Sequence, residues 1–269
     1  MLTQNDEKLF VRQDWIGRMS FHAMSDREVM TEAVRRVTQA RAKSQRNPIV
    51  ILDLDSTLYE VRTRTHKILR EWCDSKNSGA FPRARDRILQ LEFEHLNYSI
   101  RDLFSFLDTS ENHDAIFESI KNFWQPRFFT NDYLEADFAY PGAARWVQSL
   151  HELGAEIVYL TGRDEPGMGT GTRANLVRDG FPWDTGRTHL LLKKTFDEPD
   201  LDHKKNAAAW IQERGEVIAS LENEPPNLIA LAEAFPSAMN VFVETICSTH
   251  PAPIRSGFYR LKNFENWRS

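Results

Sequence analysis

The sequence predicts an α/β protein built on a parallel sheet of about five strands with helices on both faces. Short apolar runs alternate with amphipathic helical segments along residues 141–245, the pattern of a covered parallel sheet. A further apolar run, 48–58 with the sequence PIVILDLDSTL, lies far upstream. Polar residues suited to catalysis follow four of these strands, which places a site at the carboxyl edge of the sheet.

The first strand is 49–52, a short β-branched run of the kind that is buried on both faces. Asp53 and Asp55 follow it directly. Two close carboxylates repel one another unless a cation or a shared proton relieves them, and Mg²⁺ prefers such oxygen ligands. Ser56 and Thr57 can cap the turn that leaves the strand. The alternative interpretation of this pair alone is a solvated aspartate turn.

Composition limits the class of protein. With 269 residues and 41% hydrophobic content the chain has material for a substantial core, while a net charge of −5 argues against a general nucleic-acid or membrane-surface binder. Cys73 and Cys247 are far apart and have no metal-ligand spacing, so free thiols are expected. The first residues, MLTQNDEKLF, do not resemble a targeting segment, and we expect a cytoplasmic protein.

Three regions are predicted along the chain. Residues 1–47 form a helical arm that packs on the core, with a helix after Ser25. Residues 48–58 and 141–269 form the α/β core. Residues 59–140 form an inserted helical cap, with amphipathic segments at 84–97, 99–108 and 113–124. The cap aromatics are assigned to the cap's own core, and a minority of them are expected to line a pocket: Phe93, Phe104, Phe106, Phe117, Phe123 and Trp124.

The core elements follow in order after the cap. A helix begins with Pro141 and stops at Gly154, as expected for proline at a helix start and glycine beyond its end. The remaining elements are a strand at 155–160, a helix at about 171–179, a strand at 188–194, a helix at 200–215, a strand at 216–222, a helix at 226–235 and a strand at 239–245. The stretch 165–172, EPGMGTGT, is predicted to be a flexible loop, with phosphate contact as the minor alternative.

Candidate functional residues follow the later strands. Thr161 can hold a phosphoryl oxygen through its hydroxyl, Gly162 permits close approach, and Arg163 comes next. Glu222 at the end of another strand and Asn227 in the next turn offer oxygen ligands for a divalent ion. Plain turns at these two places are the alternative interpretation.

A lysine is needed to neutralise a phosphoryl group beside a carboxylate. Lys204 is the first choice, Lys205 the second and Lys193 the third. A solvated basic helix start is expected for at least two of them.

With these residues assembled, the chain resembles the haloacid dehalogenase-like (HAD) superfamily of phosphohydrolases. Its four motifs appear in order as DLDST, YLTGR, a helical lysine in LDHKKN, and SLENEPPN. The inserted helices match the position of a C1-type cap. The stretch YPGAARWVQSLHELGAEIVYLTGRDEP also resembles the acid-phosphatase-like branch.

The resemblance implies a Mg²⁺-dependent phosphatase. Asp53 would be the nucleophile that forms an aspartyl-phosphate, and Asp55 the general acid and then base. Thr161 and Lys204 would bind and stabilise the phosphoryl group. Phosphate binding is further assigned to Ser56, Thr57, Gly162 and Arg163, and metal binding to Asp53, Asp55, Glu222 and Asn227.

The chain departs from the family pattern at Glu222, where an aspartate is usual. The extra methylene moves the carboxylate by about 1.5 Å, so the ion can be held through water, or Glu224 or Asn227 can supply the contact. Asp55 favours phosphate esters, because relatives that act on carbon–halogen bonds usually lack this aspartate.

Four functions are compatible with these motifs. The preferred one is a phosphomonoesterase for a small soluble metabolite. The second is a phosphatase for a nucleotide or a polynucleotide end, suggested by cations of the cap: Arg62, Arg64, Lys67, Arg70, Arg83, Arg85 and Arg87. A catalytically inactive binding module is the third, and a phosphotransferase that passes the phosphoryl group to an alcohol is the fourth.

Overall fold

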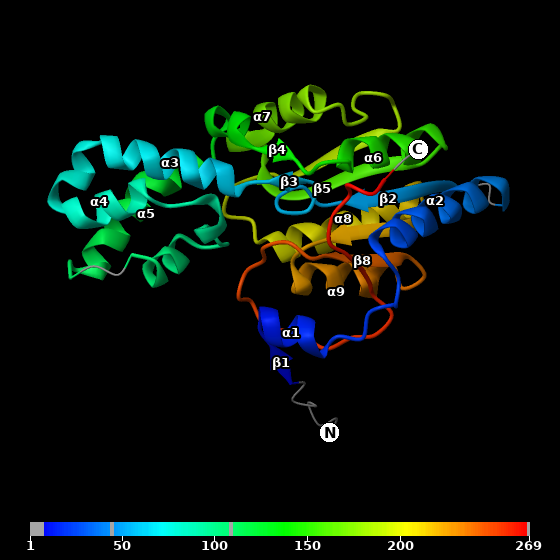
Figure 1. Ribbon diagram of the computed structural model, residues 1–269. Coiled ribbons are helices and arrows are strands. Elements are labelled where there is room, and N and C mark those ends of the chain that lie inside the picture. Colours follow the sequence, from blue (N-terminus) through cyan, green and yellow to red (C-terminus); the bar gives the residue numbers. More distant parts are fainter. Residues whose placement is uncertain (1–7, 44–45, 108–109, 268–269) are drawn as a thin grey trace, which may run out of the picture.

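A parallel sheet of six strands forms the centre of the molecule, with the order β10-β8-β7-β2-β5-β6 (Figure 1). The computed structural model describes residues 8–43, 46–107 and 110–267. The strands are β2 (Asn47–Leu52), β5 (Glu156–Asp164), β6 (Thr188–Lys193), β7 (Gly215–Glu222), β8 (Met239–Val243) and β10 (Tyr259–Leu261). The predicted fold class is confirmed, and β10 is added to the expected strands. Its three residues are too few for a sequence pattern.

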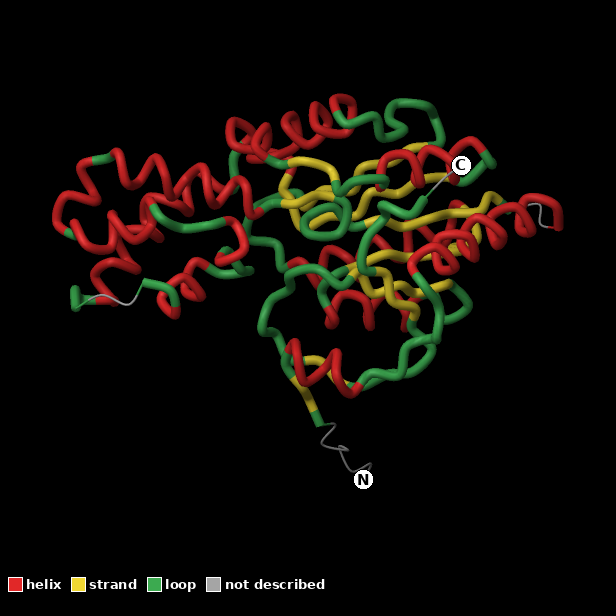
Figure 2. The backbone as a smooth tube through the Cα atoms, viewed as in Figure 1, coloured by secondary structure: helices red, strands yellow, loops and turns green. Residues whose placement is uncertain are grey.

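Helices cover both faces of the sheet (Figure 2). Val50 and Leu52 of β2 pack in one cluster with α2 (Asp26–Lys43) and α6 (Ala143–Glu152). Ile49 and Ile51, which point to the other face, pack with residues of α8 (Asp200–Arg214) and α9 (Pro225–Ala234). Burial on both faces explains why the first strand reads as a continuous apolar run.

The segment between β2 and α6 is mostly helical and projects from the sheet at the left of Figure 1. Its elements are β3 (Tyr59–Glu60), α3 (Arg62–Asp74), η1 (Lys76–Ala80), α4 (Pro82–Leu89), η2 (Phe93–His95), η3 (Ile100–Ser105), α5 (His113–Phe128), η4 (Asn131–Ala136) and β4 (Phe138–Ala139), where η marks a 3₁₀ helix. Trp72, Ile88 and Ile116 belong to a hydrophobic cluster of this segment. β3 is the first strand of this segment and β4 the last, and the two pair with each other as an antiparallel ribbon.

Two of the helices expected in this segment are shorter than their patterns suggested. The segment 84–97 is helical only to Leu89, and a 3₁₀ turn follows. The segment 99–108 contains the short η3 helix, and its last residue lies outside the described part of the chain. Ser99 caps η3 together with Asp102, so a local capping box fixes its start.

The first described elements pack beside α9 and β8, at the bottom of Figure 1. β1 (Leu9–Phe10) pairs with β9 (Ala252–Pro253), and α1 (Arg12–Arg18) follows. Trp15 on α1 is fully buried and contacts Phe242 of β8 edge-to-face, with the ring centroids 5.1 Å apart. The expected arm of residues 1–47 includes 1–7 and 44–45, which lie outside the described residues. The region boundaries stay a prediction.

The expected flexible loop at 165–172 is wrong, because this stretch is the first half of α7 (Glu165–Arg178). Asp164 caps the helix by accepting a hydrogen bond from the Gly167 amide over 2.8 Å. The glycines that suggested a loop allow close packing instead. A Cβ on Gly171 would lie 2.9 Å from the Asn131 carbonyl oxygen, so only glycine lets α7 approach η4 this closely.

No described helix is long and apolar enough to cross a bilayer.

Candidate active site

The carboxyl edge of the sheet opens into a cavity of about 240 Å³ between the core and the helical segment. Residues after β2, at the end of β5 and at the end of β7 line its floor, as expected for an open α/β sheet. The lining includes Asp53, Asp55, Ser56, Thr161, Gly162, Arg163, Lys204, Glu222 and Asn227. The structure therefore brings together all but one of the predicted site residues, the exception being Thr57.

Lys204 lies between two buried carboxylates at the bottom of this cavity. Its Nζ donates to Asp53 Oδ1 over 2.7 Å and also to Glu222 Oε2. The three side chains come from α8, the end of β2 and the end of β7, and each residue is at most 5% exposed. Lys205 is exposed, and Lys193 binds the Phe196 carbonyl and Asp200 instead. Geometry therefore favours Lys204 among the three candidate lysines.

Burial and neighbouring charges shift the pKa values of these three residues. Burial raises the pKa of Asp53 against the opposing effect of Lys204. Burial and the nearby charge of Asp53 raise the pKa of Glu222 to about 8. Burial acts to lower the pKa of Lys204, but the two carboxylates outweigh it and the pKa is raised. Two buried carboxylates thus share one ammonium, and a second cation is needed for both of them to be ionised at neutral pH.

Asp55 has a different environment. Arg163 Nε donates to Asp55 Oδ1 over 2.7 Å, and Arg163 Nη2 bonds to the same oxygen. Burial acts to raise the pKa of Asp55, but Arg163 and then Arg64 outweigh it and hold the pKa below its usual value. Arg163 was predicted to bind phosphate; in the structure its guanidinium group binds Asp55, Asp137 and Thr172.

The second motif continues β5 through an irregular stretch rather than forming a plain turn. The register of β5 against β6 shifts between Leu160 and Asp164. This shift lies at Thr161 and Gly162, which both reach the cavity lining. A Cβ on Gly162 would lie 2.4 Å from Asp200 Oδ2, so this glycine allows the strand end to approach α8.

The turn after Asp55 contains a residue in the left-handed region. Ser56 has φ +58° and lines the cavity. Thr57, also predicted to bind phosphate, is fully buried and donates from Oγ1 to Asn223 Oδ1 over 3.2 Å. The Thr57 hydroxyl also acts to lower the pKa of Asp53, against the larger effect of burial, so Thr57 contributes to the environment of the candidate nucleophile.

The oxygen-bearing side chains at the bottom of the cavity decide whether the site can bind a metal ion. Among the residues that the structure describes, no group of three or more His, Cys, Asp or Glu side chains forms a metal cluster. Asp53, Glu222 and the Asn227 amide nevertheless offer oxygen atoms on one cavity, and oxygen is the ligand that a hard cation prefers. Glu222 Oε1 accepts backbone N–H bonds from Asn223 and Glu224, each 3.0 Å long, which fix its carboxylate.

Aromatic side chains form the wall of the cavity on the side of the helical segment. The cavity is lined there by Trp124 and Phe128 of α5 and by Phe129, which directly follows this helix. Trp124 stacks on Phe128 with the ring centroids 4.3 Å apart. Of the six aromatics considered from the sequence, Trp124 is on the lining; the others pack against the cluster of the segment. Phe128 and Phe129 were missed, although Phe128 lies four residues after Trp124 and so on the same helical face.

Comparison with known proteins agrees with this architecture. Residues 105–221 match the model of the family Acid_phosphat_B, described as HAD superfamily, subfamily IIIB (acid phosphatase). The match begins after the first motif and ends just before Glu222. No curated protein matches the chain.

Solved structures share the fold at low identity. A candidate phosphatase from Clostridium difficile is 12% identical, with 82% of this chain and 96% of that chain covered and a TM-score of 0.51. Protein tyrosine kinase A from Mycobacterium tuberculosis is 13% identical over the same shares, with a TM-score of 0.50. At this identity the likeness concerns the fold alone.

The family match and the fold together indicate the class of protein, an α/β phosphatase, and its sheet carries a polar-lined cavity at the carboxyl edge. The predicted resemblance to the HAD superfamily and its acid-phosphatase branch is confirmed, and so is the enzyme class, a phosphomonoester hydrolase. A phosphate ester is accordingly the class of substrate.

Proposed function

We propose that this protein is a Mg²⁺-dependent phosphomonoesterase that hydrolyses a small phosphorylated metabolite through an aspartyl-phosphate on Asp53. The contact between Asp53 and Lys204 carries the proposal, because it joins the candidate nucleophile and the candidate stabilising cation at a cavity floor.

The reaction has two phosphoryl transfers. Asp55 first takes up a proton from solution, because its lowered pKa leaves it ionised in the free protein. A carboxylate oxygen of Asp53 attacks phosphorus, the bond from phosphorus to the ester oxygen breaks, and Asp55 gives this proton to the leaving alcohol. Water then attacks the phosphorus of the aspartyl-phosphate and gives a proton to Asp55. The bond from phosphorus to Asp53 breaks, and inorganic phosphate leaves. Thr161 and Lys204 hold the phosphoryl oxygens in both steps.

Asp53 and Glu222 are the proposed side-chain ligands of Mg²⁺, with Asn227 and the backbone carbonyl of Asp55 as further oxygen donors. Bound there, the ion would neutralise charge on the transferring phosphoryl group. The excess of buried carboxylate over ammonium at the cavity floor supports this assignment.

A small substrate is favoured by the size of the cavity. Its volume, about 240 Å³, lies below the range of about 300–1,000 Å³ that is usual for drug-sized ligands. The apolar wall around Trp124 and Phe128 suits an organic group on the ester oxygen. An exposed nucleotide chain would need a basic groove instead.

The cations that suggested a polynucleotide substrate have partners within the protein. Arg64 is fully buried against Asp137, and Lys67 pairs with Glu135. The others bind protein acceptors as well, namely Arg62, Arg70, Arg83, Arg85 and Arg87. Because these cations bind groups of the protein itself, a polynucleotide end is the less favoured substrate. The cytoplasmic location stays a prediction.

The first test is hydrolysis of p-nitrophenyl phosphate by the wild type and by Asp53→Asn, each with Mg²⁺ and with EDTA. We expect turnover in the wild type that requires Mg²⁺, and none in the variant. Glu216→Gln serves as a control, because Glu216 is an exposed carboxylate at the opposite end of the strand that carries Glu222.

Two outcomes would contradict the proposal. Undiminished turnover in folded Asp53→Asn would exclude the aspartyl-phosphate, and a wild type inactive on a panel of phosphate esters with Mg²⁺ would favour the inactive binding module. For an active enzyme, a KM that rises steeply with salt would indicate a polymer substrate. Transfer of phosphate to an added alcohol would indicate a phosphotransferase.

A further inference from the structure

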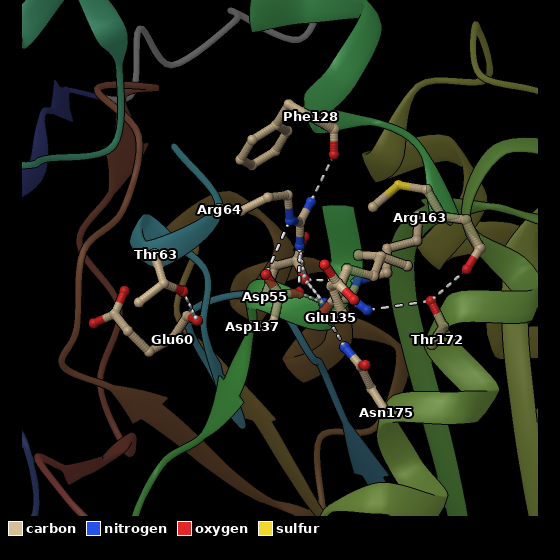
Figure 3. Close-up of polar contacts among 12 residues, drawn as sticks. Asp55, Glu60, Thr63, Arg64, Phe128, Glu135, Asp137, Arg163, Thr172 and Asn175 are labelled. Atoms are coloured by element: carbon tan, nitrogen blue, oxygen red, sulfur yellow. Dashed lines mark hydrogen bonds and ion pairs between the residues drawn. The ribbon is translucent and has the colours of Figure 1, made fainter. Parts of the chain in front are cut away.

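Four charged side chains form a chain of ion pairs beside the site (Figure 3). Arg64 Nε donates to Asp137 Oδ1 over 2.9 Å. Arg163 Nη2 donates to Asp137 Oδ2, also over 2.9 Å, and Arg163 Nε donates to Asp55 Oδ1. Asp137 therefore bridges two arginines, and the second of them holds the candidate general acid.

The cluster is buried but electrically balanced. Arg64, Asp137 and Arg163 are each at most 2% exposed, and the two aspartates match the two arginines in charge. Removing such groups from water is expensive, and a buried ion pair is often no more stabilising than apolar residues of the same volume. Stability alone is therefore a weak explanation for this cluster.

Its members connect the helical segment with the core. Arg64 lies on α3 and Asp137 directly before β4, whereas Arg163 lies on β5. Arg64 Nη1 also donates to the Phe128 carbonyl oxygen over 3.0 Å, and its guanidinium lies 4.2 Å from the centre of the Phe128 ring. Phe128 lines the cavity, so the cluster runs from the aromatic wall to Asp55.

The hydrogen bonds at Asp55 are unequal between its two oxygens. Arg163 binds Oδ1 through both Nε and Nη2. Among the described residues we find no hydrogen-bond donor to Oδ2, and the side chain is 34% exposed at the cavity. One oxygen is thus fixed by the cluster, and the other is available to carry the proton.

We propose that the Arg64–Asp137 ion pair is a positioning device: it holds Arg163, and through it Asp55, so that Asp55 Oδ2 faces the leaving oxygen of the substrate. This inference rests on the proposed phosphatase function. In the first transfer the proton moves from Oδ2 to the ester oxygen as its bond to phosphorus breaks. Without the charge of Asp137, Arg64, which lies 3.8 Å from Asp55 Oδ1, competes with Arg163 for that carboxylate and turns it.

The dependence of kcat/KM on the leaving group distinguishes a positioning role of the Arg64–Asp137 pair from a merely structural one. Phenoxide needs a proton to leave, whereas 2,4-dinitrophenoxide is stable without one. The experiment compares kcat/KM for phenyl phosphate and 2,4-dinitrophenyl phosphate in the wild type and Asp137→Asn, because kcat/KM reports the steps up to the first phosphoryl transfer. We expect a loss of about 100-fold or more on phenyl phosphate and less than about 10-fold on the dinitrophenyl ester.

Two further variants complete the test. Glu156→Gln is the matched control, because Glu156 is a buried carboxylate that accepts a hydrogen bond from Arg214 at the start of β5, away from the cavity. It should leave the ratio of the two kcat/KM values unchanged. Arg64→Lys keeps the charge but loses the two-pronged contact with Asp137, and should shift the ratio in the same direction as Asp137→Asn even if the latter fails to fold.

The outcomes separate the inference from the function on which it rests. Equal losses on both esters, or no loss on either, in folded variants of an active enzyme would overturn the positioning role and leave the phosphatase intact. A wild type inactive on both esters would overturn the proposed function, and the positioning role with it.

Discussion

Lys204 Nζ donates a hydrogen bond to Asp53 Oδ1 over 2.7 Å, and both side chains are almost completely buried. The same ammonium binds Glu222, so it is the only cation in direct contact with either carboxylate among the described residues. The position of the candidate nucleophile therefore depends on this lysine.

Lys204→Met should abolish turnover and destabilise the protein. Two buried carboxylates would lose their counter-ion, and breaking a buried pair in this way costs about 3–5 kcal/mol of unfolding free energy. Urea denaturation and p-nitrophenyl phosphate hydrolysis measure the two effects. Lys205→Met is the matched control and should alter neither, because Lys205 is exposed. Full activity in Lys204→Met would contradict the site.

Mg²⁺ should raise the thermal midpoint of the wild type, because a ligand that binds only the folded state stabilises it by mass action. Glu222→Gln removes a proposed ligand and should reduce that rise and weaken the apparent Mg²⁺ affinity by about 10-fold or more. Differential scanning fluorimetry over a Mg²⁺ titration measures both. Glu216→Gln should behave as the wild type. An unchanged titration in Glu222→Gln would show that this glutamate does not hold the ion.

Trp124→Ala should raise KM more than it lowers kcat. Trp124 lies on the cavity wall and is not among the residues proposed to hold the phosphoryl group, so its contacts should favour the bound substrate and the transition state alike. Steady-state kinetics with phenyl phosphate measures the two constants. Phe104→Ala, which truncates an aromatic packed in the segment and absent from the cavity lining, is the comparison. A kcat effect alone would argue against a binding role for this wall.

Gly171→Ala should destabilise the protein by about 1–3 kcal/mol, because the added methyl overpacks the contact between α7 and η4. It would meet Leu134 Cδ1 at 2.8 Å and the Asn131 carbonyl oxygen at 2.9 Å. Gly17→Ala is the control on α1, where a Cβ meets nothing within 4 Å and alanine favours the helix. Chemical denaturation of both variants tests the packing, and a stabilised Gly171→Ala would refute it.

Acidification should destabilise the protein partly through His151. Burial, with a smaller effect of Arg187, lowers the pKa of His151 below 6.5 in the folded protein. The unfolded chain then binds the proton more readily, so this contribution is present above about pH 6.5 and is lost as the pH falls through the folded pKa. His151→Gln should reduce the drop in thermal midpoint between pH 8 and pH 5. An identical drop in both proteins would contradict this assignment.

Much of the site follows from the sequence because the carboxyl ends of parallel strands share one edge of a sheet. Asp53, Thr161 and Glu222 each end or directly follow an apolar run, and this pattern is visible without coordinates. The helical lysine was harder to choose, since Lys204 and Lys205 are adjacent. Only the direction of each side chain from α8 separates the buried residue from the exposed one.

Local patterns failed where distant contacts decide the structure. The glycines of 165–172 suggested a loop, but they lie in a helix, and Gly171 packs against η4, which is far away in the sequence. Likewise, no spacing rule connects Arg64, Asp137 and Arg163, which come from three distant positions in the chain.

The sequence by itself determined five strands of the sheet, the order of the motifs and the residues at the carboxyl edge, because burial periodicity and strand-end chemistry are local properties of the chain. Tertiary structure alone decided which lysine meets Asp53, which aromatics face the cavity, and that Arg163 holds Asp55 rather than standing free. Those are contacts between residues far apart in the chain, and only packing brings them within hydrogen-bonding distance.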